Sequence, residues 1–129
     1  MASNVAGHGL IEAFSRGDVE AMRGALAADA VFHSPVADYR GLEEITPILR
    51  ALARIVDVTA TVSVHGDGRE TIGVFTAQVE GRPADGVLRV VGAPGTPAGE
   101  FTLMVRPLET LLAAVKAMGR ELESSAEAG

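Results

Sequence analysis

The sequence predicts a single α+β domain in which helices cover one face of a curved antiparallel or mixed sheet and enclose a pocket. Apolar residues recur at helical spacing up to Ile55, and from Val56 onward apolar and polar residues alternate, as in a half-buried strand. Successive strands joined by short turns pair antiparallel, and helices before and after them pack on one face of the sheet. The chain has 129 residues and a mass of 13.3 kDa, which fits one domain. We place that domain at residues 1–123 and expect a flexible tail at 124–129.

Helices dominate the first half of the chain. Gly17 is suited to end the first helix and Asp18 to cap the second. Pro35 ends a short strand because it removes a hydrogen-bond donor from the ladder. The predicted elements are a helix around Leu10–Phe14, a second helix from Asp18 to Asp29, a strand at 30–34, a loop at 35–41 and a third helix up to Ile55.

Strands dominate the second half, and one more helix follows them. A turn signal at 65–68 separates the first two strands, and the Gly/Pro-rich stretch 92–99 separates the last two. Pro107 opens the final helix at a position that suits proline. The predicted elements are strands at 56–65, 71–79, 84–91 and 101–105, and a helix with an apolar stripe from Leu108 to Leu122.

Composition excludes several classes of function. The chain has no cysteine, so thiolate chemistry and zinc ribbons are excluded. The net charge is −6 and the eleven basic residues are scattered, so we expect no nucleic-acid partner. No histidine spacing suits a metal and no phosphate or dinucleotide motif is present, so we expect neither a metal nor a cofactor. Without an apolar run long enough for a membrane span or a signal peptide, we expect a cytoplasmic protein that has no membrane contact.

Two segments carry a family resemblance. Residues 10–18, LIEAFSRGD, and residues 29–35, DAVFHSP, with Gly41 opening the next helix, resemble the SnoaL-like branch of the nuclear-transport-factor-2-like superfamily. Residues 104–108, MVRPL, also resemble the end of many SnoaL-like domains. The resemblance implies a cone-shaped fold, a pocket for a small hydrophobic ligand and a homodimer formed through the outer face of the sheet.

The catalytic residues of better-known members are only partly matched. In ketosteroid isomerases the resemblance puts Leu10 where a tyrosine stands and Ser34 where the catalytic aspartate precedes proline. Their second acid falls near Asp85. In limonene epoxide hydrolase the early strand carries Tyr and Asn, where this chain has Phe32 and Ser34. SnoaL-like polyketide cyclases, which close a ring by acid–base chemistry, are the least contradicted.

Three residues are candidates for acid–base catalysis: His33, Asp38 and Asp85. His33 has the unperturbed pKa closest to neutrality, and Asp38 in the following loop could orient its ring. Strand alternation weighs against this role, because His33 faces away from the cavity if Phe32 and Ser34 face into it. The competing interpretations are a structural histidine, a solvated turn at 38–39 and a strand-end cap at Asp85.

The predicted function is binding of a polyketide-, terpenoid- or steroid-like molecule, with or without cofactor-free cyclase, isomerase or hydrolase chemistry. The alternatives are a non-catalytic ligand-binding or dimerisation module and, third, a protein–protein adaptor. An enzyme requires at least two titratable groups converging in the pocket, a binder one or none, and an adaptor a filled cone. The predicted pocket residues are Phe14, Phe32, Ser34, Tyr39, Phe75 and Met104.

Overall fold

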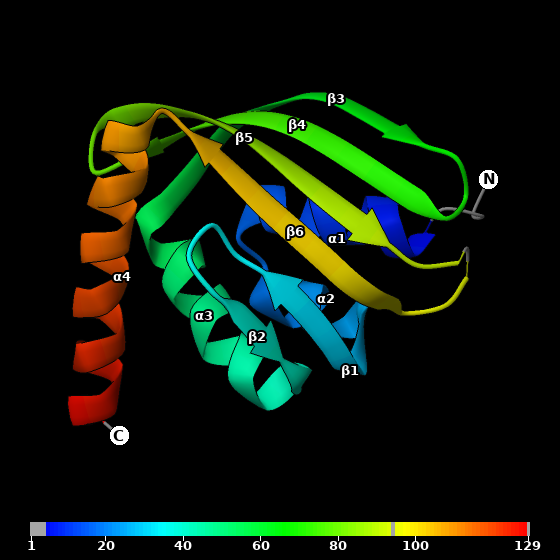
Figure 1. Cartoon of the computed structure of the whole chain (residues 1–129), viewed down its shortest axis with the longest axis horizontal. Coiled ribbons are helices and arrows are strands. Elements are labelled where there is room, and N and C mark those ends of the chain that lie inside the picture. Colours follow the sequence, from blue (N-terminus) through cyan, green and yellow to red (C-terminus); the bar gives the residue numbers. More distant parts are fainter. Residues whose placement is uncertain (1–4, 94, 129) are drawn as a thin grey trace.

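The computed structural model describes residues 5–93 and 95–128 of the chain. These residues form a six-stranded sheet and four α-helices, arranged as Figure 1 shows. The helices are α1 Val5–Arg16, α2 Val19–Gly24, α3 Gly41–Ile55 and α4 Leu108–Ala128. The strands are β1 Leu26–His33, β2 Asp38–Arg40, β3 Val56–Gly66, β4 Glu70–Val79, β5 Arg82–Val91 and β6 Ala98–Arg106.

The sheet is mixed, with the strand order β2-β1-β6-β5-β4-β3. Strands β3 to β6 form the antiparallel meander that the sequence predicts. The early strand β1 joins this meander at its far edge, where it pairs parallel with β6 and antiparallel with β2. The N-terminal part of the chain therefore completes the sheet beside the last strand.

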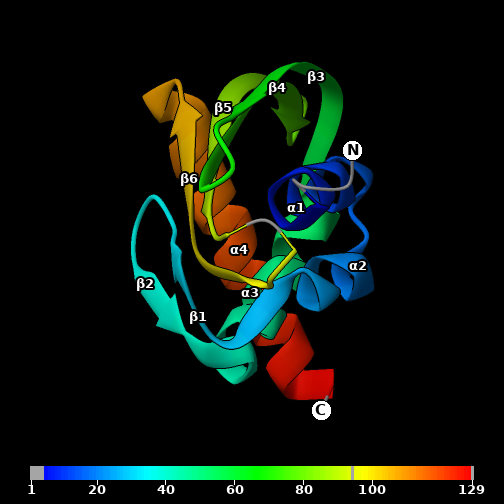
Figure 2. The same cartoon turned by 90° about the vertical axis from the view of Figure 1, so that its right-hand side faces the viewer.

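The sheet bends, and the helices lie on its concave side (Figures 1 and 2). Strand β3 shifts register twice along β4, between Val58 and Ala60 and between Thr61 and Ser63. Such bulges bend a strand and increase its twist. Helices α1, α2 and α3 lie against the concave side of the bent sheet. Helix α4 packs against α3 and the ends of β5 and β6. The prediction of an α+β fold with helices on one concave face is confirmed.

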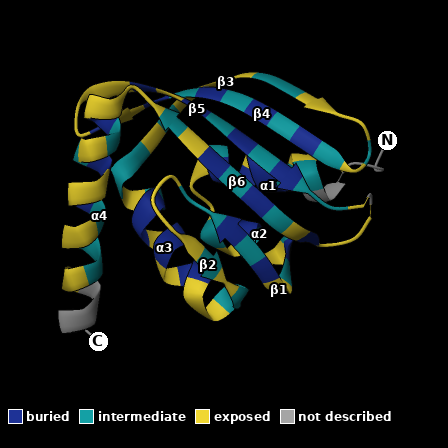
Figure 3. Cartoon of the chain, viewed as in Figure 1, coloured by how far each residue is buried: buried dark blue, intermediate teal, exposed yellow. Residues whose placement is uncertain are grey.

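Alternation along the strands separates a buried inner face from an outer face turned away from the helices. On β4, for example, Phe75 and Ala77 are buried while Val74 and Thr76 between them are partly exposed. The same pattern on β5 and β6 and the exposed side of α4 are visible in Figure 3. Gly86 on β5 is required by this packing, because a Cβ atom there would overlap the ring of Phe75.

Several boundaries differ from the sequence-based expectation, among them the end of α2 at Gly24 rather than at Asp29. Strand β1 begins at Leu26 rather than at residue 30, because Leu26 pairs with Ala98 of β6. Residues 38–40, expected to be loop, form β2 by pairing with the end of β1. Helix α4 continues to Ala128, across most of the stretch where a tail was expected. The pairing of Leu26 with Ala98 joins opposite ends of the chain, so a short window of sequence does not reveal it.

Candidate functional site

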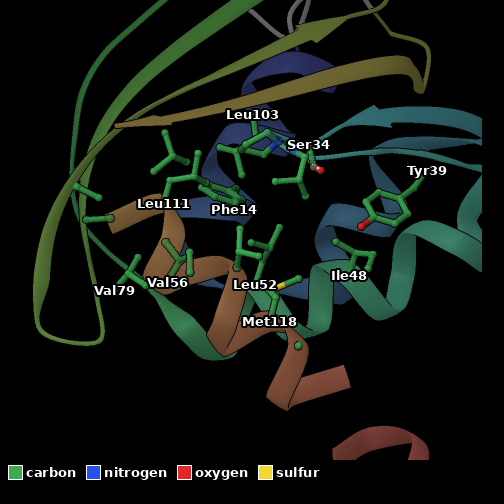
Figure 4. Close-up of a pocket in the computed structure, with 18 of the residues that line it drawn as sticks. Phe14, Ser34, Tyr39, Ile48, Leu52, Val56, Val79, Leu103, Leu111 and Met118 are labelled. Atoms are coloured by element: carbon green, nitrogen blue, oxygen red, sulfur yellow. Dashed lines mark hydrogen bonds between the residues drawn. The ribbon is translucent and has the colours of Figure 1, made fainter. Parts of the chain in front are cut away.

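A cavity of about 260 Å³ lies between the concave face of the sheet, α3 and α4 (Figure 4). Small side chains leave this space open, since Ala77 and Ala84 are cross-strand neighbours on β4 and β5 and both face it. Ala114 on α4 closes it from the other side. The lining consists of Phe14, Ser34, Pro35, Val36, Tyr39, Ile48, Leu52, Val56, Phe75, Ala77, Val79, Ala84, Leu103, Val105, Leu111, Ala114, Val115, Met118, Gly119 and Leu122.

Two aromatic rings form one wall of the cavity. The rings of Phe14 and Phe75 meet edge to face, with their centroids 5.2 Å apart and their planes at 61°. This geometry suits the charge distribution of aromatic rings. Both residues were predicted from sequence to line a ligand pocket, and the structure places both on the wall of this cavity.

The lining contains two polar side chains, Ser34 and Tyr39. The hydroxyl of Ser34 is used by its own turn: Oγ donates to the carbonyl of Ala37 at 2.7 Å and accepts from the amides of Ala37 at 3.0 Å and Val36 at 3.3 Å. Ser34 therefore shapes the β1–β2 turn, which brings Val36 to the cavity.

Tyr39 is held on β2 opposite Phe32, with the ring centroids 6.1 Å apart. Phe32 itself stacks on Phe101 at 4.3 Å with the planes 5° apart. The Tyr39 hydroxyl makes no hydrogen bond with any residue that the structure describes, and Figure 4 shows its oxygen turned toward the cavity. Tyr39 is thus the one titratable side chain on this lining, as far as the described residues extend.

Two of the residues predicted to line a ligand pocket lie outside the lining of this cavity. Phe32 is only 1% exposed, and it is covered by Phe101 and Tyr39 within the core. Met104 is 52% exposed on the outer face, because its neighbours Leu103 and Val105 face the cavity and strand residues alternate. On a strand, inward and outward residues alternate, so Leu103 and Val105 face the same side as the buried Phe101. This alternation is the sequence signal that favours them over Met104 as cavity residues.

The structure brings together two of the three predicted catalytic residues, on the outer face. His33 Nδ1 lies 2.9 Å from Asp38 Oδ1, and His33 Nε2 lies 2.7 Å from Glu100 Oε2. The hydrogen bonds to Asp38 and Glu100 raise the pKa of His33 above its usual value. Glu100 was not among the predicted residues, because it reaches His33 only through the parallel pairing of β1 with β6.

Asp85 lies apart from this pair. Its carboxylate accepts a hydrogen bond from Arg106 at 2.9 Å on the exposed outer face. Arg106 is four residues beyond Thr102, which stands opposite His33 on β6, and this corresponds to roughly 13 Å along a strand. None of the three predicted catalytic residues is among those lining the cavity. Their catalytic roles stay predictions.

Neither a metal site nor a membrane helix is found in the part of the chain that the structure describes. No three of its His, Asp or Glu side chains are arranged to hold a metal ion. None of the helices within 5–93 and 95–128 is long and apolar enough to cross a membrane.

Comparison with known proteins identifies the family. The family model for the SnoaL-like domain matches residues 8–105, which is most of the chain. The chain belongs to the SnoaL-like family. Helix α4 lies beyond the matched residues of this SnoaL-like domain, although it supplies part of the cavity wall. No curated protein sequence matches the chain.

Solved structures agree with the SnoaL-like assignment. A protein with a cystatin-like fold from Silicibacter pomeroyi superimposes with a TM-score of 0.84 at 20% identity, covering 98% of this chain and 92% of the other. A steroid delta-isomerase from Pseudomonas aeruginosa gives 0.78 at 28% identity, covering 95% and 94%. A protein with a ketosteroid isomerase-like fold from Catenulispora acidiphila, solved with trimethylamine, gives 0.63 at 14% identity, covering 84% and 90%. The superfamily resemblance seen in the sequence is confirmed.

Proposed function

We propose that this SnoaL-like protein binds one compact, uncharged and mainly apolar molecule in the cavity. The observation that carries this proposal is the lining, in which Ser34 and Tyr39 are the polar side chains and every other residue is apolar or glycine. Apolar surface removed from water contributes about 25 cal/mol per Å², which favours an apolar ligand at such a wall. The family supports the same class of ligand, since its members often bind small hydrophobic molecules or act as isomerases.

The charge of the lining argues against an ionised ligand. No Lys, Arg, His, Asp or Glu is among the described residues that form the wall. An ionised carboxylate or ammonium group transferred to such a site would lose its hydration without gaining a partner, and that transfer is strongly unfavourable.

The size of the cavity narrows the ligand further. An apolar cavity of about 150 Å³ accepts benzene, whereas sites for drug-sized ligands measure about 300–1,000 Å³. At about 260 Å³ this cavity lies between the two. It therefore suits a terpenoid or polyketide fragment of one or two rings better than a four-ring steroid.

Binding without acid–base catalysis is the better supported of the two functions predicted from sequence. Cofactor-free acid–base chemistry needs an acid and a base that reach the substrate, and the described lining offers Tyr39 as its one titratable group. The position that matches the isomerase tyrosine is Leu10, a core residue 1% exposed. The 28% identity with the Pseudomonas aeruginosa steroid delta-isomerase therefore supports the fold and a ligand cavity more than it supports that enzyme's reaction.

Calorimetric titration with two probes of one carbon skeleton tests the proposal. We expect camphor, which is neutral, to bind, and camphorsulfonate, which is anionic, to bind at least tenfold more weakly. Ala114→Leu fills the cavity from α4 and should abolish camphor binding while the melting temperature is kept or raised. Ala113→Leu on the same helix, which does not line the cavity, is the matched control and should bind camphor normally. If wild type binds no camphor, or if both leucine variants bind it equally well, the cavity is not the site.

We further propose that two copies of the chain pair through the outer face of the sheet. The family resemblance implies this arrangement. The face itself supports it, since Val74, Val87 and Met104 stand in direct register across β4, β5 and β6 as an apolar row. Ion pairs between Glu70 and Arg89 and between Asp85 and Arg106 flank this row.

A further inference from the structure

We infer that the ligand of the cavity carries one neutral oxygen, as a carbonyl or hydroxyl group at one end of the molecule, and that Tyr39 recognises it. This inference rests on the proposed binding function and specifies the chemical class of the ligand. It goes beyond the family assignment, because Tyr39 lies on β2 whereas the isomerase tyrosine position falls at Leu10 on α1.

Two side chains of the described lining can form hydrogen bonds, Ser34 and Tyr39. The Ser34 hydroxyl is fully engaged, since it donates once and accepts twice within its own turn. The Tyr39 hydroxyl faces the cavity without a partner among the described residues. A hydroxyl that loses contact with water without gaining a partner costs roughly 1–3 kcal/mol. A pure hydrocarbon would impose this cost on Tyr39, and a ligand oxygen would remove it.

The described lining carries no charged side chain. Ammonium groups need a carboxylate and carboxylates need a cation, and the described lining provides neither. A phenol can donate to a carbonyl or hydroxyl oxygen and can accept from a hydroxyl. Neutral oxygen groups are therefore the polar groups that this wall can accommodate.

The position of Tyr39 is set by the fold before a ligand arrives. Tyr39 is fixed by the β1–β2 pairing and by the ring of Phe32, which is itself held by its stacking on Phe101. A polar group held in place before binding loses little conformational entropy when the ligand arrives. Figure 4 shows Tyr39 on one side of the cavity and Val56, Val79 and Leu111 on the other. The ligand oxygen is thus expected at one end, with apolar atoms filling the rest.

Three probes with the same bicyclic skeleton test this inference: camphor has a carbonyl, borneol has a hydroxyl, and camphane has neither. By calorimetric titration, we expect wild type to bind camphor and borneol roughly 3- to 10-fold more tightly than camphane, as one net hydrogen bond predicts. Tyr39→Phe removes the hydroxyl and keeps the ring. It should abolish this preference and raise the affinity for camphane several-fold, because the hydrocarbon then leaves no hydroxyl without a partner.

Two further measurements identify the site. Tyr39 is the single tyrosine of a chain without tryptophan, so its emission reports on this position alone. Camphor should change that emission in wild type. Ser34→Ala removes the other hydroxyl of the lining and should affect camphor and camphane equally, because Ser34 acts through its turn.

The outcomes separate the two proposals. If wild type binds none of the three probes, the proposed binding function fails and this inference fails with it. If all three bind with equal affinity, or if Tyr39→Phe keeps the preference for the oxygen-bearing probes, the cavity binds ligands but Tyr39 does not select them. Camphor binding that leaves the tyrosine emission unchanged would equally overturn the role of Tyr39.

Discussion

His33 and Tyr39 are six residues apart in the chain and face opposite sides of the same sheet. His33 pairs with Asp38 and Glu100 on the outer face, whereas Tyr39 turns inward and lines the cavity. The β1–β2 turn between them produces this separation, because His33 stands opposite Asp38 and Phe32 stands opposite Tyr39. A histidine suited to proton transfer is thus placed in an ion-pair cluster, and a phenol remains for ligand contact.

The His33 cluster predicts a pH-dependent contribution to stability. The pKa of His33 is raised by its hydrogen bonds to Asp38 and Glu100, so folding favours the protonated imidazole. The stabilising contribution should be fully present below the unfolded pKa of about 6.5 and should be lost as pH rises through the higher folded pKa. Partly exposed pairs of this kind contribute about 0–1 kcal/mol each, so the effect is a modest one.

Thermal denaturation of wild type and His33→Gln between pH 5.5 and 9 measures this contribution. The melting temperature of wild type should exceed that of His33→Gln most at pH 5.5, and the difference should shrink steadily toward pH 9. A difference that stays constant over this range would mean that folding does not raise the pKa of His33.

At the scale of elements, the shape of the cavity depends on two glycines with opposite surroundings. At Gly86 on β5, a methyl group would overlap the ring of Phe75 and push it from its place against Phe14. At Gly119 on α4, a methyl group would meet no atom within 4 Å. The same substitution should therefore have opposite effects at these two positions.

We predict that Gly86→Ala destabilises the protein by roughly 1–3 kcal/mol through overpacking and weakens camphor binding. Gly119→Ala should stabilise it by about 0.5–1 kcal/mol, because alanine favours a helix interior more than glycine does. Urea denaturation of both variants, followed by camphor titration, measures the two effects. Equal stability of the two variants would show that the Phe75 ring can shift away from a methyl group at position 86 without cost, and it would contradict this prediction.

The helices and strands of this fold can be predicted from the sequence more readily than the contacts between them. The alternation in β3 and β4 and the apolar stripe of α4 were enough to predict a meander followed by a helix. The stripe of α4 gave no indication that Leu111 and Met118 would close a cavity, because a helical period does not specify what the helix packs against. The contact of His33 with Glu100 spans 67 residues and depends on the parallel pairing of β1 with β6, for which no local signal exists.

At the scale of the whole molecule, the outer face predicts the oligomeric state. Met104 is the most exposed member of the apolar row, and a charge there would have to be buried against the second copy. Wild type should therefore elute as a dimer, with twice the chain mass of 13.3 kDa, and Met104→Lys as a monomer. Light scattering after size exclusion gives these masses directly.

Leu112→Lys provides the control for this experiment. Leu112 is 54% exposed, close to the 52% of Met104, but it lies on α4 rather than on the sheet. This variant should remain a dimer. A monomeric wild type, or a Leu112→Lys variant that dissociates as Met104→Lys does, would contradict pairing through the outer face.

The position of β1 in the sheet also bears on how the chain folds. Strand β1 is made early in the sequence, but of its two partners only β2 is close by, while β6 is the last strand of the chain. Pairings between distant segments are slow because a long loop must close before they gain any contacts. During synthesis, the edge of β1 that pairs with β6 therefore stays unpaired until β6 has been made. The side of the cavity that carries Tyr39 is consequently expected to form in the last stage of folding, when nearly the whole chain is available.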